Sequence, residues 1–280
     1  MSCSQRSLEL EATIWGTATE STTQWILVEY TKEWIPKMRI PELNLPSQFA
    51  SVLESVSKLD GWKVLFIRRT GCTGQKVYWW DITTGSCKVA PISSDWTNGL
   101  ESNEAWTHPQ DIGLGSPQVL VCTHGSRDRC CGVLGGAIFA QLKNQLKMML
   151  PDAVWQVSHL GGHRFAPTAL CLPLGLLLGR IDVDDCSSIA MAVMTNESAP
   201  LRTEIIRGDV RLSKTQQARV LWLRQQSGSL VSVTGNGFTW SDSEGHVHQT
   251  VQSKMELGEM AASCGDTKTK MMYKWDFQTS

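Results

Sequence analysis

The residue types best suited to chemistry gather in one loop, residues 122–132, which reads Cys-Thr-His-Gly-Ser-Arg-Asp-Arg-Cys-Cys-Gly. The loop supplies three thiols, Cys122, Cys130 and Cys131, directly after a short apolar strand predicted at 118–121. Thiolates bind zinc and iron–sulfur clusters and also act as redox groups. The end of a strand is a good host for such a ligand, because the strand fixes the direction of the side chain.

A second loop supplies two imidazoles. His159 and His163 follow the next predicted strand, 153–157, and are separated by Leu-Gly-Gly. The two glycines allow a tight backbone curl, so both imidazoles can point to the same place. If strands 118–121 and 153–157 run parallel in one sheet, both loops lie at the carboxyl ends of neighbouring strands. We therefore expect the thiols and imidazoles to meet in one metal site.

The elements around these loops occur in the same order twice. The first half is expected to hold a strand, a helix capped by Ser47, a strand and a hairpin, at 25–30, 47–59, 61–67 and 76–90. The second half repeats this order at 118–121, 133–150, 153–157 and 169–181. A parallel βαβ unit followed by a hairpin is the order of a thioredoxin-like fold. We expect an α/β protein of two thioredoxin-like units, each a mixed sheet flanked by helices.

The units are expected at 1–110 and 111–200, with the polar segment 99–117 at their boundary. A small C-terminal appendage, 201–280, is expected to contain a helix at 213–226 with Ser213 as its N-cap. Short strands should follow at 230–233, 237–241, 246–251 and 271–276. Residues 1–22 show no regular pattern and are expected to be irregular.

Composition indicates a globular protein without a bulk basic charge. Hydrophobic residues make up 41% of the chain, and the formal net charge of −1 gives no reason to expect binding to nucleic acid or a membrane surface. No apolar run approaches the roughly 18 residues of a membrane span. The first residues lack the pattern of a secretory signal, so a cytoplasmic location is expected. The nine cysteines are an odd number, which favours ligation or redox chemistry over a disulfide framework.

Taken together, the motifs at 122–132 and 158–169 resemble those of the sucrase/ferredoxin-like family of thioredoxin-like ferredoxins. The resemblance covers approximately residues 12–182 and is weak in the first half. It implies a [2Fe-2S] cluster with two cysteine and two histidine ligands, and a role in electron transfer with a redox partner protein that the sequence does not identify. Nothing in the sequence indicates a substrate reaction, so we do not expect an enzyme. The sequence also leaves the oligomeric state open.

Carried over by position, the ligands implied by the resemblance are Cys122, Cys131, His159 and His163. The family's Arg-Asp-x-x-Cys-Gly pattern falls on residues 127–132, which favours Cys131. The doubled thiol leaves Cys130 as the alternative.

Four residues are expected around the ligands: His124, Arg127, Asp128 and Arg164. Positive charge from the arginines should favour the reduced, more negative state of a cluster and raise its potential. A histidine ligand can also hold a proton on its outer nitrogen, so a pH-dependent potential is expected.

Two other functions remain open from the residues alone. A Cys₂His₂ set also binds zinc, so the protein could be a zinc-stabilised interaction module without a redox role. The nine-residue spacing from Cys122 to Cys131 is wider than in usual zinc pairs, which disfavours this function. The third candidate is a thiol redox protein that uses Cys130 or Cys131.

Overall fold

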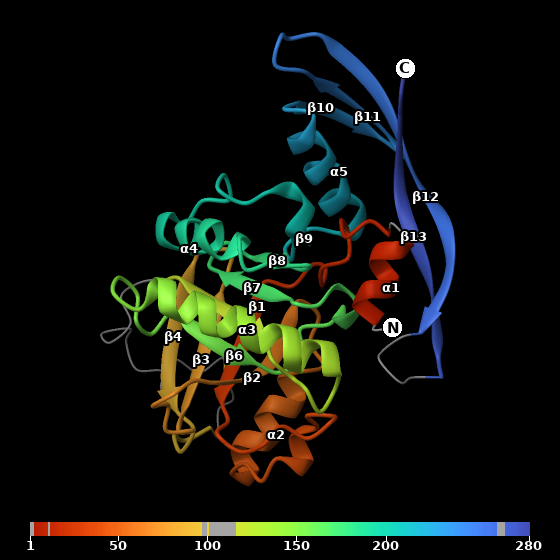
Figure 1. The fold of residues 1–280 in the computed structure, drawn as a ribbon. Coiled ribbons are helices and arrows are strands. Elements are labelled where there is room, and N and C mark those ends of the chain that lie inside the picture. Colours follow the sequence, from red (N-terminus) through yellow and green to blue (C-terminus); the bar gives the residue numbers. More distant parts are fainter. Residues whose placement is uncertain (1–2, 11, 97–99, 101–115, 262–266) are drawn as a thin grey trace.

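The computed structural model describes residues 3–10, 12–96, 100, 116–261 and 267–280. Within them the protein is mixed α/β, with a nine-stranded sheet, a four-stranded sheet and five α-helices (Figure 1). This confirms the predicted α/β class. Most of the predicted boundary segment, 99–117, lies outside the described residues, and the division into units at 110/111 and 200/201 stays a prediction.

The first half forms one end of the large sheet. Its elements are β1 (Gln24–Glu29), α2 (Ser47–Val56), β2 (Trp62–Arg68), β3 (Lys76–Asp81) and β4 (Ser86–Pro91). The strands lie in the order β4-β3-β1-β2, with β1 parallel to β2 and antiparallel to β3. The predicted N-cap is wrong: Pro46 occupies the cap position, and no side chain caps the helix. Ser47 therefore lies one residue inside α2.

The second half repeats this arrangement. Its elements are β5 (Gln118–Cys122), α3 (Arg129–Leu146), β6 (Val154–Val157), β7 (Ala169–Leu172) and β8 (Leu176–Leu178). The order is β6-β5-β7-β8, and β5 and β6 are parallel neighbours, as predicted. Helix α3 begins four residues before the predicted start, because Asp128 caps it by accepting a hydrogen bond from the Cys130 backbone N–H at 2.9 Å. Cys130 and Cys131 therefore lie in its first turn.

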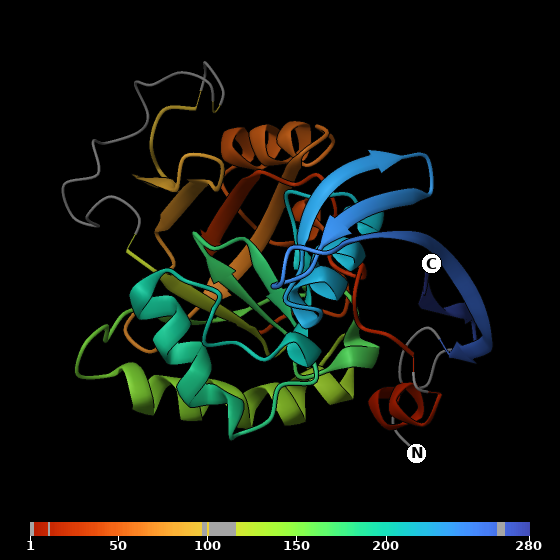
Figure 2. The same cartoon turned by 90° about the horizontal axis from the view of Figure 1, so that it is seen from above.

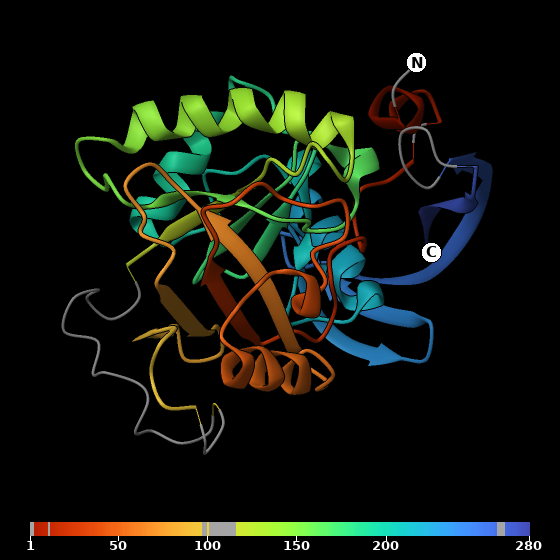
Figure 3. The ribbon, with the colours of Figure 1, turned by 90° about the horizontal axis from the view of Figure 1, so that it is seen from below.

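The two halves face each other across a shared apolar core. Strands β2 and β6 pair only near Ile67–Val157, where the sheet passes from one half to the other. Away from this short pairing the two halves are joined by side chains: Trp25 and Leu27 of β1 lie in the same buried apolar cluster as Leu120 of β5. The outer faces pack separately, one on α2 and the other on α3 and α4 (Asp185–Thr195). Figures 2 and 3 show α2 on one side of the strands and α3 with α4 on the other.

The large sheet continues past the second half. Strand β9 (Ile206–Asp209), which the sequence did not reveal, pairs antiparallel with β8. Helix α5 (Lys214–Gln225) follows, and its predicted cap is confirmed. Ser213 Oγ accepts from the Gln216 N–H at 3.4 Å, and the Gln216 side chain accepts from the Ser213 N–H at 3.0 Å. This reciprocal capping box fixes the start of α5.

The C-terminal part is a separate four-stranded antiparallel sheet. Its strands are β10 (Ser229–Thr234), β11 (Gly237–Ser241), β12 (Val247–Ala261) and β13 (Thr269–Thr279). Strands β12 and β13 are much longer than predicted and form a hairpin that runs down to the N-terminal helix α1 (Cys3–Glu9) (Figure 1). The expectation of an irregular N-terminal segment is wrong for α1. This seven-residue helix lies against β12 and against the 3-10 turn His163–Phe165, so tertiary contacts decide it.

Candidate functional site

Cys122 and Cys131 meet where β5 ends and α3 begins. The Cys131 thiol donates a hydrogen bond to the Cys122 sulfur, and the His159 ring donates a second one. Both sulfurs are buried, each residue being 1% exposed. The hydrogen bond from Cys131, aided by that from His159, lowers the pKa of Cys122 well below its usual range. The same bond raises the pKa of Cys131, so Cys122 ionises first.

Two glycines of α3 let the helix come this close to Cys122. A Cβ atom on Gly135 would collide with the carbonyl oxygen of Cys122. A Cβ atom on Gly132 would collide with the backbone of Gly125 in the loop before the helix. The first turn of α3 can therefore bring Cys131 to the end of β5 only with residues that lack a side chain at these positions.

The two predicted histidines lie side by side. The ring centroids of His159 and His163 are 5.3 Å apart, and both glycines between them adopt positive φ, +79° at Gly161 and +70° at Gly162. His163 is 8% exposed, whereas His159 is half-buried. Nδ1 of His159 is a buried atom without a hydrogen-bond partner among the described residues. Such a nitrogen is costly unless it binds a ligand, so the donor set fits a metal or cluster.

The adjacent cysteines Cys130 and Cys131 point to two different places. Cys131 faces Cys122, whereas Cys130 Sγ lies 3.7 Å from Cys3 Sγ and 3.8 Å from Ser4 Oγ. Successive helix residues point about 100° apart, so the two thiols cannot share one site. The structure therefore places Cys131 and His159 each against Cys122, with His163 beside His159, and leaves Cys130 outside that group.

The first half of the chain covers the cysteine loop. The His124 ring, 1% exposed, bonds through Nε2 to the Ile35 carbonyl oxygen at 2.9 Å and lies edge-on to Trp34 at 5.5 Å. Ser126 Oγ donates to the Trp34 carbonyl oxygen at 2.5 Å. Burial lowers the pKa of His124 and so disfavours the charged form of its ring. His124 therefore anchors the loop after β1 over residues 122–132.

The other predicted neighbours take different positions. Asp128 is buried and caps α3, while Arg127 is exposed. The Arg164 guanidinium lies 4.6 Å above the Phe165 ring, and burial lowers the pKa of Arg164. Of the two arginines, only Arg164 is partly enclosed beside the histidine loop.

Sequence reasoning missed Arg207 of β9, which is 2% exposed. Its guanidinium donates to Gly161 O at 2.9 Å, to Thr17 Oγ1 at 3.1 Å and to the Thr17 carbonyl oxygen. Burial lowers the pKa of Arg207 to about 9, while its charge is stabilised by the nearby Cys122 and Cys131 sulfurs. A lone arginine in an unrecognised four-residue strand gave no signal. Its placement adds a buried cation to the site.

The whole cysteine and histidine site lies inside a region that matches one known protein family. A family model described as sucrase/ferredoxin-like matches residues 14–208. The chain belongs to the sucrase/ferredoxin-like family. This confirms the predicted family and extends the matched region beyond residue 182, so that it includes Arg207. Helix α1 and the four-stranded sheet lie outside the sucrase/ferredoxin-like region.

Among curated proteins, this chain is similar to altered inheritance of mitochondria protein 32 from Meyerozyma guilliermondii. The two are 35% identical over 77 residues, which is 25% of this chain and 27% of the relative. The match thus spans about a quarter of the relative's length. No solved structure gives a significant match. Among the described helices, none is both long and apolar enough to cross a membrane.

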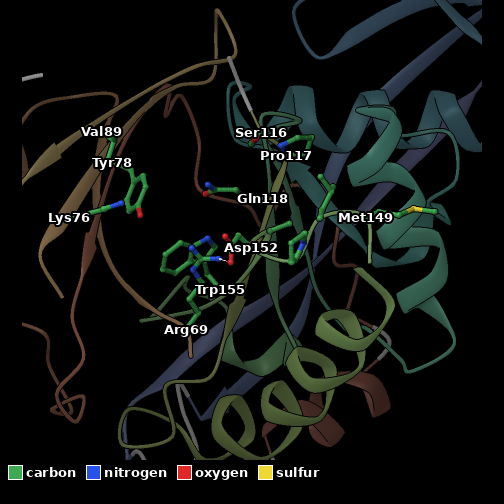
Figure 4. Close-up of a pocket in the computed structure, with 13 residues that line it drawn as sticks. Arg69, Lys76, Tyr78, Val89, Ser116, Pro117, Gln118, Met149, Asp152 and Trp155 are labelled. Atoms are coloured by element: carbon green, nitrogen blue, oxygen red, sulfur yellow. Dashed lines mark ion pairs between the residues drawn. The ribbon is translucent and has the colours of Figure 1, made fainter. Parts of the chain in front are cut away.

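A separate groove of about 310 Å³ lies at the opposite end of β5 (Figure 4). It opens beside Gln118 at the start of that strand and contains Tyr78 and Trp155, whose rings meet edge-on at 5.7 Å. An ion pair between Arg69 and Asp152 crosses it. None of the predicted ligands lines this groove, so it is distinct from the cysteine and histidine site.

Proposed function

We propose that this protein is an electron-transfer protein whose second half, a thioredoxin-like unit, holds a [2Fe-2S] cluster through Cys122, Cys131, His159 and His163. The observation that supports it is the convergence of two loops: Cys131 and His159 both hydrogen-bond the buried Cys122 sulfur, and His163 lies beside His159. A bound [2Fe-2S] cluster accepts and donates one electron at a time. The first half, also thioredoxin-like in strand order, serves as a scaffold.

The surrounding charges fit this role. Arg207 places a buried cation next to Cys122 and Cys131, and it is held there by Gly161 and Thr17. A fixed positive charge favours the more negative state of the site and raises its reduction potential. In return, the thiolates of the site stabilise the buried guanidinium, which would otherwise be costly to bury.

His159 is the most exposed of the four proposed ligands, while the two cysteines are 1% exposed. We therefore place the approach of a redox partner protein on the histidine side. His159 and His163 can each hold a proton on the ring nitrogen that is not used for ligation. The potential should then fall with rising pH, by up to about 59 mV per unit for one proton per electron. A potential that stays flat from about pH 6 to about pH 9 would count against histidine ligation.

The deciding experiment compares the visible spectrum of the wild type with those of Cys131→Ser and Cys130→Ser. The wild type should be brown, with absorbance beyond about 400 nm that dithionite bleaches. Cys131→Ser should lose this absorbance, because it removes the thiol that faces Cys122. Cys130→Ser is the matched control, one residue away, and should keep it.

Two results would refute the proposal. A colourless wild type that carries zinc at this site, although iron was supplied during expression, would favour the zinc module. Equal loss of colour in Cys130→Ser and Cys131→Ser would overturn the assignment of Cys131 as the ligand.

A further inference from the structure

Three buried side chains meet next to the histidine loop, outside the group proposed to hold the cluster. Cys3 comes from α1, and Asp128 and Cys130 come from the start of α3. Their sulfur and carboxylate atoms all lie within 4.8 Å of one another, and no member is more than 6% exposed. We propose that Cys3, Asp128 and Cys130 form a second metal site, a structural Zn²⁺ site that fastens the N-terminal helix to α3.

The spacing of the thiols matches zinc rather than a disulfide. With a Zn–S distance of about 2.3 Å, two sulfurs on a tetrahedral ion lie about 3.8 Å apart. The observed separation of Cys3 Sγ and Cys130 Sγ is 3.7 Å. A disulfide needs about 2.05 Å, so the sulfurs would have to move towards each other. The present spacing is therefore compatible with two thiolates on one zinc ion without movement of the sulfurs.

Asp128 supplies the third ligand without giving up its cap. Its Oδ1 accepts from the Cys130 N–H at 2.9 Å, while its Oδ2 lies 3.8 Å from Cys3 Sγ. The fourth position falls to Ser4 Oγ, 3.8 Å from Cys130 Sγ, to the His163 carbonyl oxygen, 3.9 Å from Cys3 Sγ, or to a water. Two thiolates and a carboxylate with one further ligand suit the tetrahedral preference of Zn²⁺.

The charges around the site agree with this donor set. Binding releases two thiol protons to solvent and leaves Zn²⁺ with three anionic ligands, a net charge of −1. Arg164 interacts electrostatically with Cys3 and lies in the same region. Arg180 donates to the carbonyl oxygens of Ser7 and Ala12, each at 2.9 Å, and so places a second cation beside α1. These cations offset the buried negative charge.

The site explains how so short a helix keeps its place. A seven-residue helix is not stable by itself, and α1 rests on the turn that carries His163. A metal shared with α3 would hold α1 over one side of the proposed cluster site. Cys3 lies outside the residues matched by the family model, 14–208. The proposed zinc site therefore joins one ligand from the N-terminal segment to two, Asp128 and Cys130, from the family region, and it shares no ligand with the proposed cluster.

The test measures zinc and iron in the full-length protein, purified from cells supplied with both metals. The variants are Cys3→Ser and Cys130→Ser, and the control is Cys72→Ser, a half-buried thiol in the loop after β2. Wild type and Cys72→Ser should each hold about one Zn²⁺ per chain more than Cys3→Ser and Cys130→Ser. Iron content and visible absorbance should be the same in all four, which separates this site from the proposed cluster.

Alkylation with iodoacetamide gives a second readout that does not depend on metal carried through purification. Adding Zn²⁺ alone to chelator-treated protein should protect Cys3 and Cys130 together, with Cys72 unaffected. Equal zinc content in Cys3→Ser and Cys72→Ser would overturn the proposal. Equal alkylation of Cys3 and Cys130 with and without added Zn²⁺ would also overturn it. Absence of iron in every variant would refute the proposed cluster but leave the zinc comparison valid.

Discussion

Substituting alanine at Gly162 should damage the site far more than the same change at Gly161. Both glycines have φ near the left-handed region, +79° at Gly161 and +70° at Gly162, so each pays the same backbone penalty, about 1–2 kcal/mol. Their surroundings differ. A Cβ atom on Gly161 meets nothing within 4 Å, whereas a Cβ atom on Gly162 would overlap the Arg207 guanidinium.

The extra cost at Gly162 comes from displacing a buried cation. Arg207 is 2% exposed and cannot turn into solvent without losing its hydrogen bond to Gly161 O or those to Thr17. Losing one hydrogen bond to a charged group costs about 1.5–3 kcal/mol. The total for Gly162→Ala is then about 2.5–5 kcal/mol, against about 1–2 kcal/mol for Gly161→Ala.

Urea unfolding at pH 7, followed by tryptophan fluorescence, measures both variants against the wild type. The difference in free energy of unfolding between them should be about 1.5–3 kcal/mol, with Gly161→Ala as the matched control. Iron content should also fall in Gly162→Ala, because the guanidinium and the histidine loop move together. If Gly162→Ala lowers the free energy of unfolding no more than Gly161→Ala does, Arg207 does not pack against the histidine loop as described.

Three further predictions test other parts of the structure. His163→Cys should keep a visible chromophore but flatten the pH dependence of its potential, and complete loss of colour would mean that the loop needs the imidazole for its shape. Burial pushes the pKa of Asp185 up, but the Arg202 hydrogen bonds at 2.5 and 2.8 Å, the hydrogen bond from the Asp182 N–H and the charge of Arg202 together lower it by more, so the net pKa lies below its usual value. The pair therefore stabilises the protein above about pH 4 and loses this effect as the pH falls through the lowered pKa. Arg202→Gln should cost about 1 kcal/mol at pH 7, as measured by urea unfolding, and a cost that persists unchanged at pH 3 would contradict the ion pair. Ser213→Ala should lower the free energy of unfolding by about 1 kcal/mol through loss of the capping box, whereas Ser213→Gly should cost only a few tenths; equal costs would argue against side-chain capping.

The sequence by itself determined the elements that position the site. Alternating and helical apolar patterns are local, so they revealed the strand–helix–strand–hairpin order of both halves. The same patterns placed Cys122 at the end of a strand and the histidine pair after the next one. The capping box at Ser213 was readable for the same reason, since its two members lie three residues apart. The family was readable because both of its motifs are short and contiguous.

Local patterns could not show which thiol faces Cys122. Expecting a helix from residue 133 left both Cys130 and Cys131 in a loop, where either could turn inward. The Asp128 cap starts α3 at Arg129 and so fixes the direction of each thiol, about 100° apart. Which of Cys130 and Cys131 faces Cys122 therefore depended on where α3 begins, and the exact ends of a helix are hard to predict from its sequence pattern.

Only the tertiary structure decided the contacts between distant segments. Arg207 reaches the histidine loop from a strand too short to recognise, and Cys3 meets Cys130 across more than a hundred residues. Helix α1 packs against β12, and β12 in turn pairs along its length with β13. These contacts join distant parts of the chain, so no periodic pattern in the sequence of any one segment reveals them. The buried cation and the second thiol site therefore exist only once the chain has folded, because their members are adjacent in space and not in sequence.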